Sequence, residues 1–421
     1  MVSRPIPIRA RNNEAVEQDE QARRHRPDYW LVVIALFLIS VGLIVVYAIS
    51  PALTATDGST GSHYVSRQMI AVFMSIVAFL VTARIPLSVW RRWQKPLIVV
   101  AALGTLMALV TPVIPEYPAH RWIRLGGLSL QSVEPLKYAL LVWFASFLTI
   151  KAREGKLSEG KQTLQPLVIV VVIIGIVVAG IQSDLGSTGV IVAMLGAMAY
   201  IAGLPMKRIL MVVGIIAIGT ILLVSAIPYR RERLFTFLHP ESNCLTTGYQ
   251  ACQALIAVGS GGINGLGLGR SVQAYGYLPE AQDDSIFAIY AEKFGFVGVM
   301  LLLGLFVTLF ARLRTILERS PDMFSRLVVA GVLAWLSTQT IINVGAMIGL
   351  LPLKGITLPF VSYGGTSVLF VGAALGLVFQ ISHYTSFTPR NVKRSERPNY
   401  EDSGDGRRVR RAYHPDLSSR A

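Results

Sequence analysis

Long uncharged apolar blocks constrain this chain more than any other feature of its sequence. The first block, residues 29–49, contains no charged side chain. About 20 residues of α-helix, each rising 1.5 Å, cross the hydrocarbon core of a bilayer, so this block is long enough to span it. A cleavable signal peptide fits poorly, because a polar stretch of about 28 residues precedes the block and the apolar run is too long. We therefore expect a retained membrane anchor.

Nine further apolar blocks follow, without the alternating strands of a membrane barrel. Only α-helices and closed barrels satisfy their backbone groups within a bilayer, so all ten blocks are interpreted as helices. The predicted spans are residues 29–49, 67–86, 96–114, 133–150, 164–182, 187–203, 207–227, 285–311, 326–350 and 366–384. The predicted fold class is an all-α polytopic membrane protein of about ten transmembrane helices, with a long extracytoplasmic loop between helices 7 and 8.

The distribution of Lys and Arg predicts the orientation of these helices. If the N-terminus is cytoplasmic, the inner segments hold about 29 of the 39 basic residues and the outer loops about eight. Both termini are therefore expected in the cytoplasm. The net charge of +15 then reflects topology and contact with anionic membrane lipids rather than binding of nucleic acid.

Three regions follow from this pattern: a tail at 1–28, a transmembrane domain at 29–384 and a second tail at 385–421. Both tails are rich in Arg, Pro, Asp, Glu and Ser and poor in large apolar residues. Such a composition cannot bury enough apolar surface to fold, so we expect the tails to be disordered.

The extracytoplasmic loop, residues 228–284, is too long for a simple connector, since connections above about 15 residues are usually functional or disordered. It carries Arg230 and Arg233 near its start and a glycine-rich run at 259–269. Glycines permit close approach, and exposed N–H groups in such a run can hold phosphate. No Gly-Lys-Ser/Thr follows, so a nucleotide site is not expected. A flexible re-entrant hinge is favoured over a phosphate cradle.

The only cysteines of the chain, Cys244 and Cys252, both fall in this loop. An extracytoplasmic compartment can be oxidising, which permits a disulfide. Loop geometry decides whether the two thiols pair, so a local disulfide and two free thiols both fit the sequence.

The loop ends on Asp283 and Asp284, at the N-terminal edge of the next predicted helix. One interpretation is N-capping, because Asp satisfies free N–H groups and complements the helix dipole. The other is a general base at the membrane surface, since partial burial raises the pKa of a carboxylate toward the working pH. The residues alone leave both open.

Charged residues also flank the span predicted at 133–150. Arg121 precedes it and fits either a phospholipid headgroup or the pyrophosphate of a substrate. Glu134 and Lys137 are three residues apart and share a helix face. They form either an ion pair that neutralises itself or part of a polar site, because charges in membrane spans are costly and usually functional.

Two further outer segments carry polar candidates. The turn at 182–189 contains Asp184, although a tight turn explains Asp and Gly there without a function. The last outer segment, 352–367, contains Lys354 and Ser362 and is rich in Gly and Pro yet apolar. Such a segment is expected to dip into the protein rather than to be a solvated loop.

Residue patterns of metal and hydrolase sites are missing from the sequence. The six His include no His-x-x-x-His pair, and the two Cys lack zinc spacing. No Gly-x-Ser-x-Gly elbow is present either.

Five segments together resemble the SEDS proteins (shape, elongation, division and sporulation), the family of FtsW and RodA. They are Arg-Trp-Ile with Gln-x-x-Glu-x-x-Lys (121–137), Gln-x-Asp-Leu-Gly-Ser-Thr-Gly (182–189), Gly-Tyr-Gln with a glycine run (248–269), Tyr-Leu-Pro-Glu-Ala-x-x-Asp (277–284) and Leu-Pro-x-Lys-Gly-x-Thr-Leu-Pro-x-x-Ser-Tyr-Gly-Gly (351–365). Each alone is weak, but their order at the ends of ten spans is specific. The last segment is more similar to the FtsW division branch than to the RodA branch.

The resemblance implies a peptidoglycan glycosyltransferase, an inverting hexosyltransferase that makes glycan strands from lipid II for the septal wall in cell division. It implies a multi-pass protein of the bacterial cytoplasmic membrane that works with a class B penicillin-binding transpeptidase and other divisome membrane proteins. The family's proposed general base falls on Asp284. Its cavity Glu and Lys fall on Glu134 and Lys137, and its Arg-Trp motif falls on Arg121 and Trp122.

The remaining site residues are expected at the same outer surface. The residues predicted to bind substrate or its pyrophosphate are Arg121, Glu134, Lys137, Arg230, Arg233, Lys354 and Ser362. A divalent cation, Mg²⁺ or Mn²⁺, could serve instead of the basic residues, since pyrophosphate often binds one.

The chain also departs from the family pattern. The family often has His-Thr before its Asp, whereas this chain has Gln282 and Asp283. Two neighbouring carboxylates can share a proton, so Asp283 stays a candidate beside Asp284. Two motif prolines are replaced by Ser132 and Ser183, which can shift the local backbone.

Two other functions are alternatives to a polymerase: a lipid transporter and a non-catalytic scaffold. A transporter that flips the same lipid predicts polar residues through the whole bilayer depth, whereas here they gather at the outer ends of the spans. A non-catalytic scaffold of the division complex would tolerate loss of Asp284.

Overall fold

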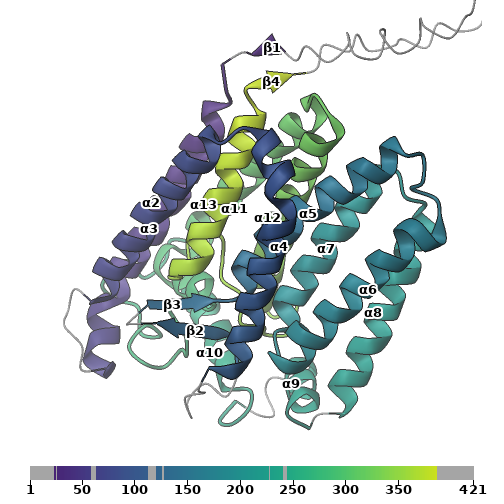
Figure 1. The fold of residues 1–421 in the computed structure, drawn as a ribbon. Helices are drawn as coiled ribbons and strands as arrows, with labels where there is room; N and C mark the ends of the chain where they lie inside the picture. The colour runs from purple at the N-terminus through teal and green to yellow at the C-terminus, as the bar shows by residue number, and fades with distance from the viewer. Residues whose placement is uncertain are drawn as a thin grey trace, which may run out of the picture. The chain divides into compact units, whose positions relative to one another are not determined.

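The computed structural model describes residues 23–24, 26–57, 63–111, 120–125, 128–226, 228–239 and 244–385. Most of the two predicted tails, with the disorder expected for them, lies outside these residues. The described chain is mainly helical (Figure 1).

Each of the ten predicted spans overlaps a helix, although several predicted ends differ from the helix ends by a few residues. The helices are α2 (Tyr29–Asp57), α3 (His63–Arg84), α4 (Leu87–Val110), α5 (Val133–Arg153), α6 (Gln165–Ile174), α7 (Leu185–Ala202), α8 (Met206–Ala226), α11 (Ile286–Arg319), α12 (Met323–Met347) and α13 (Gly365–Ile381). Two π-helical segments, η1 (Gly160–Leu164) and η2 (Gly175–Ile181), extend α6 at its ends. Within the described chain, eight helical segments are long and apolar enough to cross a membrane, and α13 is a shorter apolar helix. The protein is thus a polytopic helical membrane protein, while the count of ten crossings stays a prediction.

Close helix packing depends on small residues. A Cβ added at Gly372 of α13 would lie 2.2 Å from Ser75 Oγ of α3, and one added at Gly376 would lie 2.2 Å from Thr82 Oγ1. Membrane helices associate through such small residues because lipid supplies no hydrophobic drive between them. Helices α5 and α12, in contrast, are largely enclosed by their neighbours.

Both ends of the described chain meet at one end of the helices. Strand β1 (Arg23–Arg24) pairs antiparallel with β4 (Tyr384–Thr385), as Figure 1 shows at the top. Below this pair, Arg312 of α11 contacts Asp28 at 2.5 Å, and the Asp28 N–H donates to Ser382 Oγ at 3.1 Å. The two ends of the described chain therefore lie on the same side of the helices, in agreement with the charge distribution.

The opposite end carries two short helices and a hairpin. Helices α9 (Pro228–Leu238) and α10 (Tyr249–Ser260) belong to the predicted extracytoplasmic loop, and strands β2 (Trp122–Leu125) and β3 (Leu128–Gln131) pair before α5. The expectation of an all-α chain overlooked these strands, because four residues are too few to show a period.

The glycine-rich run packs against a kink in α11. Gly295 within this helix has φ 63° and ψ −166°, and a Cβ added there would lie 2.3 Å from the Gly265 nitrogen. The N–H groups of Leu266 and Gly267 donate to the carbonyls of Glu292 and Lys293, both at 2.9 Å. These two donors are engaged by the protein itself and are not available to a phosphate, while the flexible hinge stays a prediction.

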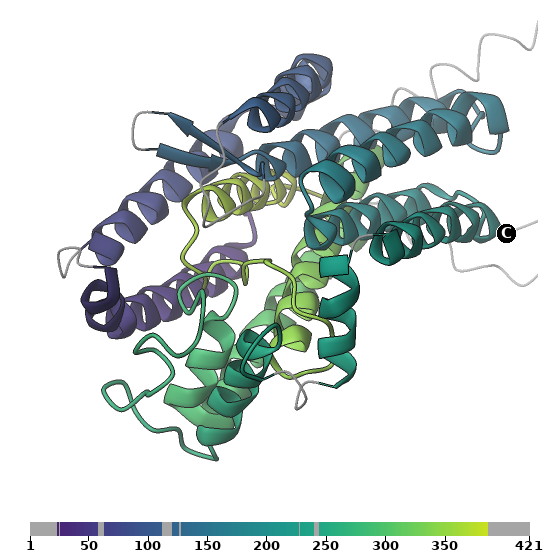
Figure 2. The same ribbon diagram turned by 90° about the horizontal axis from the view of Figure 1, so that it is seen from below.

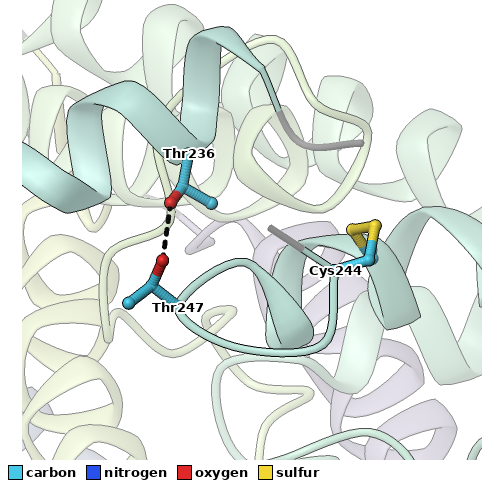
Figure 3. Close-up of a disulfide and its surroundings, with 4 residues drawn as sticks. Thr236, Cys244 and Thr247 are labelled. Carbon is cyan, nitrogen blue, oxygen red and sulfur yellow. Dashed lines mark hydrogen bonds between the residues drawn. A yellow bond between two sulfur atoms is a disulfide. The ribbon is translucent and has the colours of Figure 1, made fainter. Parts of the chain in front are cut away.

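A disulfide joins Cys244 to Cys252, with a Cα–Cα distance of 5.5 Å (Figure 3). It connects the turn before α10 to the first turns of that helix. Nearby, the hydroxyls of Thr236 on α9 and Thr247 lie 3.2 Å apart. The sequence left the pairing open, and the structure forms the bond.

Gly265→Ala is expected to destabilise the protein. Gly265 has φ +78°, and an added Cβ would lie 2.2 Å from the Lys293 carbonyl oxygen, so strain alone should cost about 2 kcal/mol. Thermal unfolding in detergent measures the effect. Gly269→Ala is the matched control, because an added Cβ there meets open space. Equal midpoints for the two variants would contradict the packing described here.

Reduction of the disulfide should lower the free energy of unfolding by roughly 2–3 kcal/mol, the loop-closure value for so short a loop. The measurement is thermal unfolding with and without a phosphine reductant. A Cys244→Ser, Cys252→Ser double variant should unfold at the reduced midpoint and ignore the reductant. A wild type that is insensitive to reductant would show that the bond adds no stability.

Candidate active site

The predicted site residues gather at the end of the helices that is opposite the paired termini. Figure 2 views the molecule from this end. The residues come from the segment before α5, the turn before α7, the chain before α11 and the segment between α12 and α13. Arg230 and Arg233 lie on α9, but their side chains are outside the described part, so their role stays a prediction.

The segment between α12 and α13 is irregular and joins the chain before α11 by hydrogen bonds. The Tyr363 N–H donates to the Gln282 carbonyl at 2.9 Å. Ser362 Oγ donates to the Asp283 carbonyl at 2.6 Å and accepts from the Leu358 N–H at 2.7 Å. Ser362 therefore positions this segment against the acidic pair, and its direct contact with substrate stays a prediction.

A buried amide holds Asp284 in place. Asn343 of α12 is 1% exposed, and its Nδ2 donates to the carbonyls of Asp284 and Ile356, both at 2.7 Å. One side chain thus fixes the backbone of the predicted base and that of the irregular segment together. Sequence reasoning missed Asn343, since a single Asn within an apolar helix has many structural explanations.

The Asp284 carboxylate and the Arg121 guanidinium border the same space at Gly355. A Cβ added at Gly355 would lie 3.6 Å from both Arg121 Nη1 and Asp284 Oδ2. The glycine leaves this space open between a carboxylate and a cation. A carboxylate and a guanidinium therefore border one small space, and their roles in the reaction stay predictions.

Carbonyl groups of the turn before α7 orient Arg121. Its Nε donates to the Gln182 carbonyl at 2.9 Å, and its Nη2 donates to the Ser183 carbonyl at 2.6 Å. Asp184 in the same turn accepts from the Ser187 N–H at 2.9 Å and from Ser187 Oγ at 2.8 Å. Asp184 thus caps α7, which agrees with the turn interpretation of that residue.

Glu134 and Lys137 form a buried ion pair on α5. Lys137 Nζ lies 2.8 Å from Glu134 Oε1, and the two side chains are 1% and 3% exposed. Lys137 Nζ also donates to Gln339 Oε1 at 3.1 Å and lies 4.8 Å from the ring centroid of Trp335. Removing one partner of a buried pair typically costs about 3–5 kcal/mol, so the pair also supports the fold.

Gln339 extends this network to the irregular segment. Its Oε1 accepts from Trp335 Nε1 at 2.8 Å, and its Nε2 donates to the Thr357 carbonyl at 2.9 Å. Thr357 Oγ1 in turn donates to Ser367 Oγ at 3.0 Å. Lys137 therefore reaches the site through Gln339, a residue that the sequence analysis missed.

Lys354 lies where this irregular segment meets α7. Its Cβ would lie 3.2 Å from a Cβ added at Gly186, and the Ile356 side chain would lie 2.5 Å from that atom. Gly186 thus admits the segment close to the first turn of α7. The position is one residue from Gly355, so Lys354 is adjacent to the space between Arg121 and Asp284.

Backbone strain concentrates in the same three segments. Of the described non-glycine residues, Ser183, Glu280 and Phe360 have positive φ, at 55°, 51° and 66°. Each such residue costs about 1–3 kcal/mol, and such strain clusters at functional sites. The strain therefore marks the place where the turn before α7, the chain before α11 and the irregular segment converge.

A family model for the cell cycle proteins FtsW, RodA and SpoVE matches residues 29–387. The chain belongs to this family. A Coxiella burnetii protein named probable peptidoglycan glycosyltransferase FtsW is 37% identical over 363 residues, covering 85% of this chain and 96% of that one. Stage V sporulation protein E of Bacillus subtilis is 33% identical, covering 87% and 99%. The names of its relatives support an FtsW-type protein.

Solved structures share the fold. A chain from a peptidoglycan synthase complex, solved to explain how polymerization and crosslinking are coordinated, is 26% identical with a TM-score of 0.64 and covers 85% of this chain and 97% of its own. The rod shape determining protein RodA of Thermus thermophilus is 24% identical with a TM-score of 0.59, covering 85% and 96%. The likeness to RodA concerns the fold alone.

A preformed metal site is not evident among the residues that the structure describes, where no three His, Cys, Asp or Glu side chains gather suitably. Mg²⁺ is usually bound by one or two carboxylates together with substrate phosphates and waters, so the divalent cation stays an expectation from the sequence. No step is assigned to it here.

The carboxyl group of Asp283 is buried beside other acids. Burial raises the pKa of Asp283 well above its usual range, and the charges of Glu280 and Asp284 add to the increase. At a pH between the unfolded and the folded pKa, the folded chain therefore binds a proton that the unfolded chain has released. The stabilising contribution of this group is full below the unfolded pKa and is lost as pH rises through the folded pKa.

Asp283→Asn should therefore raise the thermal midpoint at alkaline pH and have a smaller effect in acid, because the amide resembles the protonated acid. Unfolding in detergent across a pH series measures this. Glu232→Gln, at an exposed carboxylate of α9, should leave the pH profile unchanged. A midpoint that falls most at alkaline pH would show that Asp283 is needed in its charged form.

Proposed function

We propose that this protein polymerises the glycan strands of septal peptidoglycan from lipid II, with Asp284 as its general base. The chain is a peptidoglycan glycosyltransferase of the FtsW type, as its curated relatives are named. The observation that supports the residue assignment is the space at Gly355. A Cβ added there would lie 3.6 Å from both the Asp284 carboxylate and the Arg121 guanidinium.

The reaction is glycosyl transfer between two lipid-linked molecules. A sugar 4-hydroxyl of one molecule attacks the anomeric carbon of the other, and Asp284 accepts the hydroxyl proton. A new carbon–oxygen bond forms as the bond from that carbon to the isoprenoid pyrophosphate breaks. The configuration at the anomeric carbon is inverted, because the attack comes from the side opposite the leaving group.

Negative charge develops on the leaving pyrophosphate, and fixed cations stabilise it most when they are oriented in advance. Arg121 is oriented by the carbonyls of Gln182 and Ser183. Lys354, Arg230 and Arg233 are proposed as further cations for the pyrophosphate, as the sequence predicts. Lys137 is proposed to act on the site indirectly, through Gln339, because Glu134 and Gln339 hold its ammonium group.

The position of the site suits substrates that are anchored in the membrane. Charge distribution favours cytoplasmic termini in the bacterial inner membrane, so the site end faces outward. Two lipid-anchored molecules that are held in one plane lose less entropy when they align for reaction than two molecules free in solution. A class B penicillin-binding transpeptidase is the proposed partner, together with other divisome proteins, and the similarity to a synthase complex chain supports such an assembly.

Asp284→Asn should lower polymerisation by roughly 10² or more, the usual share of a general base. The assay is strand formation from purified lipid II by the full chain in liposomes, with and without its cognate transpeptidase. Asp283→Asn is the matched control and should retain activity, since burial and the neighbouring acids raise the pKa of its carboxyl group and disfavour the charged form.

If Asp283→Asn is inactive and Asp284→Asn is active, the base has been assigned to the wrong carboxylate. If no condition gives strands but labelled lipid II crosses the bilayer, the protein is a transporter. If cells tolerate Asp284→Asn without loss of division, a scaffold accounts better for the protein.

A further inference from the structure

Helices α6, α7 and α8 line a partly open apolar cavity far from Asp284 along the chain. Its enclosed volume is only about 30 Å³, so a ligand larger than one or two water molecules would lie in the open part of the cavity, along the helices. Leu167, Val171, Leu195 and Val212 are among its lining residues, and all four are aliphatic. The three helices lie side by side in Figure 1.

The cavity runs from the end of these helices toward their middle. Leu164, Leu204 and Arg208 line it at the end where α6 and α8 begin, and Ile216 lines it deeper along α8. The rise from Arg208 to Ile216 is about 12 Å at 1.5 Å per residue, close to half of the hydrocarbon core of about 30 Å. The cavity therefore has the depth of one bilayer leaflet.

Positive charge surrounds this end of the cavity. Among the described residues that line it, Arg208 alone is charged, and its Nη1 donates to the Ser158 carbonyl. The connections at 151–165 and 203–208 contain six Lys and Arg residues and two Glu residues. An apolar cavity with a basic rim complements a molecule that has an aliphatic chain and an anionic head.

The helices around the cavity have room to adapt. α6 continues into π-helical turns at both ends, and such turns occur often at functional sites. Gly196 of α7 lines the cavity, and a Cβ added there meets no atom within 4 Å. The wall is therefore open at Gly196 rather than closed by a neighbouring side chain.

We propose that this cavity binds an acyl chain of an anionic phospholipid from the leaflet on the side of the paired termini, with the lipid phosphate at Arg208. Arg suits this role because its planar guanidinium donates to two phosphate oxygens at once. The acyl chain would lie along the open side of the cavity, against the aliphatic side chains of α6 and α8. This site is independent of the reaction assigned to Asp284.

The test is lipid binding to the delipidated full chain in neutral detergent, followed by native mass spectrometry. The probes are dioleoyl-phosphatidylglycerol and dioleoyl-phosphatidylcholine, which share acyl chains and differ in net charge. Wild type should bind the anionic lipid more tightly. Arg208→Gln should weaken that binding roughly fivefold, the effect of one basic residue at a membrane surface, and Gly196→Leu should weaken binding of both lipids.

Two variants control for charge and bulk elsewhere. Arg84→Gln removes one positive charge from the end of α3, and Gly219→Leu adds bulk on α8 outside the cavity lining. Neither should change lipid binding, and thermal midpoints check that all variants are folded. Equal affinity of wild type for the two lipids would overturn the proposal. So would an equal effect of Arg84→Gln and Arg208→Gln, or unchanged binding by Gly196→Leu.

Discussion

Two amide side chains of α12 support the irregular segment that completes the active site. Gln339 and Asn343 are four residues apart and therefore share a helix face. Gln339 donates to Thr357, and Asn343 donates to Ile356 and to Asp284. Irregular backbone at membrane depth is tolerated only where the protein satisfies its polar groups. Without these amides the segment would carry unpaired carbonyls, and the predicted base would lose its anchor.

Several energetically unfavourable features lie close to this irregular segment. A buried lysine, three residues with positive φ and an acid whose pKa is raised all lie at one end of the molecule. Each is costly alone, and the surrounding contacts hold them in place. In an enzyme, such a preorganised polar site avoids reorganisation when charge develops in the transition state.

The two ends of the helices differ in chemistry. One end combines acids, oriented cations and strained backbone around Gly355. The other end joins the termini through β1 and β4 and carries the basic connections around Arg208. This division agrees with the two aqueous faces of a bilayer, because the positive-inside rule predicts that the basic end faces the cytoplasm.

The sequence by itself determined the helical spans, their sidedness and the gathering of Asp284, Arg121 and Lys354 at one end, because apolar length and charge are properties of local segments. Only the tertiary structure decided which side chains meet. Lys137 donates a hydrogen bond to Gln339, which is 202 residues away in the chain. Asp284 and Arg121 border the same space at Gly355. The closed disulfide, the π-helical turns and the cavity behind Arg208 were likewise unreadable. Such contacts depend on how helices pack, and local periodicity carries no record of that.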